Sequence, residues 1–269
     1  QMGDSFHIRH QVQPDFLLST LLGVSKALSQ EDLLSFVQSM GFRPKLLAEQ
    51  LRWGERLGLL KRREKTAIGP VDLTSSGKAL SLLASVRPSL AYEFLHLLHF
   101  SLWNREAPES NRFSWTYRTL CEEILRSGAF NYDRRKIAQF LIERAYGEFG
   151  LDESVSLSPG TVRGAMQWLS KLNPPVFEDN RVHLRVICPP ETLIMAVQHY
   201  YREHHLQVGD PVEISEEGRA SICAACLLEP AHFGSMAREA ALAYDVLEWT
   251  GAWGEFLRLR SEVNLDYFI

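Results

Sequence analysis

Apolar and polar residues follow a helical period along most of this chain, and in two places short β-type sequence interrupts it. Residues 16–22 are mostly apolar and predict a first helix. Ser29 and Asp32 form a capping-box pattern at the start of a second helix, which Gly41 closes. Pro44 stands where a third helix tolerates proline, at its first position. The pattern therefore predicts helix, turn, helix.

The third helix is predicted to have an apolar face and a mostly basic face. Apolar or small residues recur on one side at Leu47, Leu51, Gly54 and Leu57. The other side presents Lys45, Glu49, Arg52 and Arg56, which follow one another at spacings of four, three and four residues. Residues 58–73 then predict two short strands around a polar tip, and this hairpin carries Lys61, Arg62, Arg63 and Lys65.

A second stretch of the chain follows the same plan. Residues 114–127 and 132–149 predict two helices, Pro159 opens a third, and residues 176–184 predict a hairpin with an acidic-amide turn. Each proline-led helix carries a tryptophan nine residues after its proline, Trp53 in one and Trp168 in the other. Beyond proline and tryptophan the copies share no convincing identity, so the duplication is interpreted as architectural.

A helix-turn-helix followed by a basic hairpin resembles the winged helix-turn-helix superfamily. The resemblance covers about residues 14–85, with a weaker second copy at 114–187, and its motifs are generic. It implies DNA binding, with the third helix in the major groove and the wing on the flanking backbone. The residues expected to contact double-stranded DNA are Arg43, Lys45, Arg52, Arg56, Lys61, Arg62, Arg63, Lys65, Arg163, Gln167, Lys171 and Arg181.

The predicted fold class is mainly α, with tandem winged-helix modules, small β-hairpin wings and a C-terminal helical region. The predicted domains are a winged-helix domain with linking helices at 1–105, a second winged-helix-like domain at 106–190 and an acidic helical region at 191–269. In that last region residues 235–260 are expected to form a helix. A polar stretch at 104–111 supplies the first boundary.

Charge is distributed unevenly along the 269 residues, although the net charge is only -4. Residues 41–65 contain eight basic residues against three acidic ones, whereas residues 201–269 contain five arginines against twelve acids. The first segment suits a phosphate backbone and the second repels one. We therefore expect DNA at the first module and, through the acidic C-terminal region, a homodimer or a protein partner.

Composition and motifs exclude several other classes of protein. Apolar residues make up 45% and charged residues 23%, no apolar run is long enough to span a bilayer, and no signal peptide is visible, so a cytoplasmic protein without membrane contact is expected. Cys223 and Cys226 have metal-like spacing without a second pair, and a small buried helix explains them better than zinc. His96 and His99 are expected to be buried structural residues. No catalytic or nucleotide-binding motif occurs, so we expect no enzyme activity, no cofactor and no metal.

Two alternatives to DNA binding stay open. Tandem winged helices also dock proteins in chromosome-organising and defence complexes, and the mild acidity of the chain fits such a scaffold subunit. A small-molecule sensor, with C-terminal aromatic residues lining a pocket, is the weaker alternative.

Overall fold

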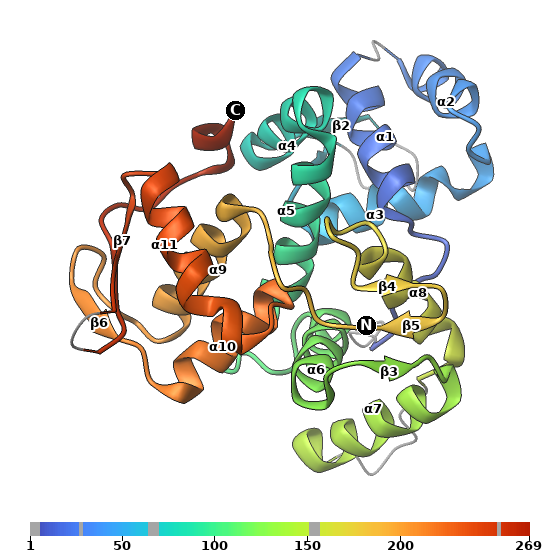
Figure 1. Ribbon diagram of the computed structural model, residues 1–269. Helices are drawn as coiled ribbons and strands as arrows, with labels where there is room; N and C mark the ends of the chain where they lie inside the picture. Colours follow the sequence, from blue (N-terminus) through green and yellow to red (C-terminus); the bar gives the residue numbers. More distant parts are fainter. Residues whose placement is uncertain (1–5, 27–28, 64–69, 151–156, 252–253) are drawn as a thin grey trace.

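The chain folds into three small units arranged around one central helix (Figure 1). The computed structural model describes residues 6–26, 29–63, 70–150, 157–251 and 254–269. Within these ranges it is mainly helical, with one two-stranded and two three-stranded antiparallel sheets. The expected mainly α character is therefore confirmed.

The first unit, residues 14–73, consists of helices and one hairpin. Ser29 and Asp32 form the predicted capping box, with Asp32 N donating to Ser29 Oγ and Ser29 N donating to Asp32 Oδ2. Pro44 opens a short 3-10 turn that runs into the third helix. The elements are α1 (Pro14–Lys26), α2 (Gln30–Ser39), the 3-10 turn (Pro44–Leu46), α3 (Leu47–Arg56), β1 (Leu60–Arg62) and β2 (Val71–Leu73). The predicted hairpin is confirmed by the β1–β2 pairing, and its tip lies outside the described residues.

The second unit, residues 112–182, contains a three-stranded sheet in the order β3-β5-β4. The hairpin predicted at 176–184 is confirmed: its two turn residues, Asp179 and Asn180, both have positive φ, as a two-residue type I′ turn requires. The elements are α6 (Arg112–Ser127), β3 (Phe130–Asn131), α7 (Arg134–Phe149), α8 (Pro159–Leu169), β4 (Phe177–Glu178) and β5 (Arg181–Val182).

The third unit, residues 190–259, repeats this order of elements, with sheet order β6-β8-β7. The prediction of a helix over 235–260 is wrong, because α11 ends at Ala243 and a hairpin follows. Gly254 has a φ of 124° in the turn, a conformation that a helix cannot contain. The elements are α9 (Pro190–Glu203), β6 (Pro211–Glu213), α10 (Glu216–Cys226), a 3-10 turn (Pro230–His232), α11 (Phe233–Ala243), β7 (Leu247–Thr250) and β8 (Phe256–Leu259).

Two connecting helices, α4 (Ser75–Val86) and α5 (Pro88–Ser101), lead from the first unit to the second. Figure 1 shows α5 at the centre, with the first and second units on one side and the third on the other. Nine of the fourteen residues of α5 are buried, so it packs against neighbours on all sides, including α4, α6, α8 and α9. Helix α5 is therefore the common core of the molecule.

The polar residues of α5 are satisfied by partners from the units around it. Glu93 Oε1 accepts a hydrogen bond from Arg185 at 2.7 Å, and both side chains are completely buried. His96 pairs with Tyr117 Oη and with the carbonyl of Ala225, each at 2.8 Å. These buried pairs join α5 to the segment after β5, to α6 and to α10. The expected burial of His96 and His99 is confirmed.

Residues 6–12 run as a strap that joins the first and second units. The carbonyl of Gln11 accepts from Gln50 of α3 at 2.8 Å, and the carbonyl of Val12 accepts from Trp168 of α8 at 3.3 Å. Gly164 of α8 is needed under the strap, because a Cβ there would lie 2.9 Å from the carbonyl oxygen of Ile8. The strap therefore fixes α3 relative to α8.

The structure also tests the helix predicted around Cys223 and Cys226 and the length of the helices. All four cysteines are free and buried, and Cys223 and Cys226 lie in α10 as the small buried helix predicted. Among the described helices, each is too short or too polar to cross a lipid bilayer.

Candidate nucleic-acid interface

Helix α3 and the turn before it expose the basic residues predicted to contact DNA. The side chains of Arg43, Lys45 and Arg52 are exposed. Arg52 forms an ion pair with Glu49 at 2.9 Å, yet 53% of its side chain remains accessible. The opposite face of the helix is buried as predicted. It consists of Leu47, Gln50, Leu51, Trp53 and Gly54. The amphipathic prediction for this helix is confirmed.

The adjacent hairpin is less positive than its sequence suggests. Arg62 Nε donates to Glu55 of α3 at 2.7 Å, and only 15% of the Arg62 side chain is accessible. Arg63 forms two hydrogen bonds with Asp72 across the hairpin, and this guanidinium lowers the pKa of the carboxyl. Lys61 is exposed beside them. The predicted site residue Lys65 lies outside the described residues.

A buried aromatic cluster holds α3 and α8 against the central helix. The ring centroids of Trp53 and Trp168 lie 6.4 Å apart. His99 of α5 lies between them, 5.4 Å from Trp53 and 4.7 Å from Trp168, and burial lowers its pKa well below the ordinary value. Phe113 of α6 packs edge-on against Trp53 at 4.7 Å. The two tryptophans that mark the proline-led helices therefore meet in one core.

Two residues of the predicted stripes contact elements outside their own unit. The Arg56 guanidinium lies over the ring of Phe113 in the second unit, 4.6 Å from its centroid. Lys171, just after α8, forms an ion pair at 2.6 Å with Asp15 of the first unit and lies over the ring of Tyr92. These contacts join the first unit to the second. Arg56 and Lys171 therefore have a structural role besides any contact with nucleic acid.

The remaining predicted residues of the second unit are separated from the first group. Arg163 of α8 and Arg181 of β5 are exposed, and Arg181 lies opposite Glu178 in the hairpin. Gln167 is half-buried, and its Oε1 is shielded from solvent. Of the predicted residues, the first unit thus exposes Arg43, Lys45, Arg52, Lys61 and Arg63 and largely covers Arg62, whereas the second unit exposes Arg163 and Arg181.

Sequence reasoning missed the acids that partner these arginines. Glu55 stands seven residues before Arg62, and Asp72 stands nine residues after Arg63. Only the packing of the hairpin on α3 and its antiparallel register place these acids beside their arginines. In the part of the chain that the structure describes, no group of three or more His, Cys, Asp or Glu side chains is arranged to hold a metal ion.

Comparison with known proteins finds a solved structure with a similar fold, but it does not assign the chain to a family. The chain matches no protein-family description and no curated protein sequence. Its fold is similar to that of a solved structure described as magnesium ion-bound SspB, with a TM-score of 0.59 and 13% sequence identity over 97% of this chain and 85% of that chain. At this identity the likeness concerns the fold alone.

Proposed function

We propose that this chain is a DNA-binding protein of the winged-helix type, and that its first unit makes the main contact with the duplex. The order of elements supports the proposal. In the second and third units a helix, a strand, two helices and two strands follow one another, and the last strand lies between the other two. A winged helix has this connectivity. The first unit has the three helices and the hairpin of this order, without a strand between its first two helices in the described residues.

The observation that carries the proposal is the exposed basic surface of the first unit. Arg43, Lys45 and Arg52 precede or lie on the third helix of that unit, and Lys61 lies on the strand that leaves it. A helix with exposed Arg and Lys can enter the major groove, while a hairpin beside it contacts phosphates. The second unit contributes at most a secondary contact, because Lys171 and Gln167 are engaged in packing.

A variant with Arg43→Gln, Lys45→Gln and Arg52→Gln tests this assignment. Binding to a fluorescent duplex is measured by anisotropy at salt concentrations between about 50 and 200 mM, because each lost phosphate contact reduces the slope of log K against log salt by about one. We expect the triple variant to bind more weakly, with a slope lower by about one for each substituted side chain that contacts a phosphate and by about three if all of them do. Each side chain is exposed, so the urea midpoint of the variant should match that of the native chain.

Arg238→Gln provides the matched control, because Arg238 is exposed on α11, the corresponding helix of the third unit. This substitution should leave the affinity and the salt slope unchanged. The proposal fails if the native chain does not bind duplex DNA at low salt, or if the triple variant binds as tightly as the control.

A protein-docking role is the second candidate, and one observation favours it. Val186 and Ile187 are adjacent apolar residues in the segment between the second and third units, and 48% and 54% of their surfaces are exposed. A second copy of the chain is the simplest occupant. Sedimentation equilibrium of the native chain and of a Val186→Ser/Ile187→Ser variant tests it, and a native chain that stays monomeric at high concentration argues against self-association.

A further inference from the structure

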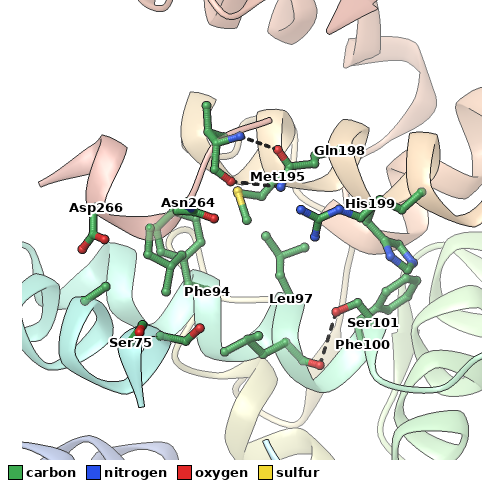
Figure 2. Close-up of a pocket in the computed structure, with 16 residues that line it drawn as sticks. Ser75, Phe94, Leu97, Phe100, Ser101, Met195, Gln198, His199, Asn264 and Asp266 are labelled. Atoms are coloured by element: carbon green, nitrogen blue, oxygen red, sulfur yellow. Dashed lines mark hydrogen bonds between the residues drawn. The ribbon is translucent and has the colours of Figure 1, made fainter. Parts of the chain in front are cut away.

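A cavity of about 290 Å³ lies between the connecting helices and the third unit, away from the basic surface of the first unit. Its walls come from α4, α5, α9 and the residues that follow β8. Figure 2 shows these residues pointing into one shared space, with Leu97 below and Met195 above. This volume is at the lower end of the range for small-molecule sites, about 300 Å³ and upward.

The middle of the cavity is apolar and its two ends are polar. Phe94, Leu97 and Met195 line the middle. One end holds Ser75, Asn264 and Asp266, and the other holds Ser101 and His199, as Figure 2 shows. Arg202 also lines the cavity and follows His199 by three residues on α9, so it lies on the same face of that helix, next to His199. A ligand with one apolar body and two different polar ends would match this lining.

The polar atoms of the middle are already used by the protein. Gln198 Nε2 donates to the carbonyl of Val263 at 3.0 Å, and Val263 N donates to Gln198 Oε1 at 2.7 Å. These two bonds, drawn as dashed lines in Figure 2, fix the C-terminal wall against α9. A ligand therefore finds hydrogen-bonding partners at the two ends. Asp266 supplies an acceptor at one end, and at the other the Ser101 hydroxyl donates to the carbonyl of Leu98 at a long 3.4 Å, a weak bond that a ligand carboxylate can replace.

Arg202 provides the positive charge at its end of the cavity. Burial lowers the pKa of His199 to about 4, so that imidazole is neutral at neutral pH. Arg202 donates to Glu262 at 2.8 Å, and about half of each of these side chains is exposed. An exposed pair of this kind contributes little to stability. The guanidinium can therefore exchange this carboxylate for that of a ligand at small cost.

We propose that the cavity binds a small aromatic or similarly apolar carboxylate that carries a hydroxyl or amine donor at its opposite end. The carboxylate pairs with Arg202 and Ser101, the apolar body lies between Leu97 and Met195, and the donor reaches Asp266. The site touches Ser75, the first residue of α4, and the N-cap of that helix, Thr74, donates to the carbonyl of Gly58 after α3 at 2.7 Å. An occupant is thus in contact with an element anchored to the first unit.

Three related probes test the proposed ligand class by calorimetry. Para-hydroxyphenylpropionate has both polar ends, phenylpropionate lacks the donor, and para-ethylphenol lacks the carboxylate. We expect para-hydroxyphenylpropionate to bind with a dissociation constant below ~1 mM and the other two about tenfold more weakly, because each lost hydrogen bond to a charged group costs about a factor of ten or more. Carbon-labelled methionine methyl groups localise the probe, and the Met195 signal should move more than those of the other methionines.

Two variants assign the ends of the ligand. Arg202→Gln should weaken both carboxylate probes about tenfold and leave para-ethylphenol unchanged. Asp266→Ala should weaken para-hydroxyphenylpropionate and para-ethylphenol and leave phenylpropionate unchanged. Arg238→Gln, an exposed arginine of the same unit outside the cavity, should change nothing.

Any of three results would overturn the proposal. The first is that the native chain does not bind para-hydroxyphenylpropionate, and the second is that the Met195 methyl signal stays in place while binding is observed. The third is that Arg202→Gln, with an unchanged urea midpoint, weakens all three probes equally. None of these readouts involves DNA, so they are independent of the proposed function.

Discussion

Removing the charge of Glu93 should cost the protein a large part of its stability. Glu93 and Arg185 form an ion pair at 2.7 Å with both side chains completely buried. Glu93 also accepts hydrogen bonds from the backbone amide of Asn173 at 2.9 Å and from the Thr192 hydroxyl at 3.1 Å. Glu93→Gln keeps the size of the side chain and leaves the guanidinium charge buried without its counter-ion. Breaking one side of such a pair typically costs about 3–5 kcal/mol.

A double-mutant cycle separates this charge effect from loss of packing. The free energy of unfolding is measured by urea titration with circular dichroism for the native chain, Glu93→Gln, Arg185→Met and the double variant. Each single variant leaves one buried charge unpaired, whereas the double variant leaves none. The double variant should therefore lose several kcal/mol less than the sum of the single losses.

The exposed pair of Arg63 and Asp72 serves as the control for this cycle, because its partners are in solvent. The same cycle there should show no measurable coupling. Two results would contradict a dominant charge effect: Glu93→Gln is as stable as the native chain, or the losses at Glu93 and Arg185 simply add.

Three further predictions follow from particular contacts. Burial lowers the pKa of His96 from 6.5 to about 4, so on acidification the unfolded chain takes up the proton at a higher pH than the folded chain. The free energy of unfolding should therefore be highest above pH ~6.5 and fall by about 3 kcal/mol towards pH 4. Urea midpoints measured across that range will show the fall, and a flat profile would contradict it. Gly77→Ala places a Cβ 2.0 Å from the carbonyl oxygen of Leu59 and should lower the free energy of unfolding by about 1–3 kcal/mol or more. In Gly147→Ala of α7 the new Cβ has no heavy atom within 4 Å, and the free energy of unfolding should rise by about 0.5–1 kcal/mol. Equal effects of the two variants would be evidence against the packing argument. Trp168→Phe removes the donor to the Val12 carbonyl and should speed amide exchange in residues 6–12, while Trp249→Phe in the third unit should not.

Local patterns were sufficient to predict the helices and the hairpins of the first two units, but not the short strand β3. The capping box at Ser29, the prolines at the helix starts and the acidic-amide turn at Asp179 act within a few residues of where they stand. Strands β7 and β8 of the third unit were missed because residues 235–260 were interpreted as one helix, and the short strand β6 was not predicted. The signals were present there, since Gly251 and Gly254 separate two stretches of alternating apolar residues.

Helical period, caps and exposed charge depend on neighbours along the chain, so the local structure and the basic surface of the first unit could be predicted from the order of residues. Which of these charges remain available depends on contacts formed in the folded chain. The tertiary structure placed Asp72 beside Arg63, Asp15 beside Lys171 and Phe113 under Arg56, pairs that no spacing in the sequence foretells. It also brought Trp53 and Trp168 together around α5 and formed the cavity from segments more than a hundred residues apart. The reason is physical: burial, ion pairing and cavity walls arise from contacts between distant segments, and the spacing of residues along the chain does not reveal which distant residues come into register.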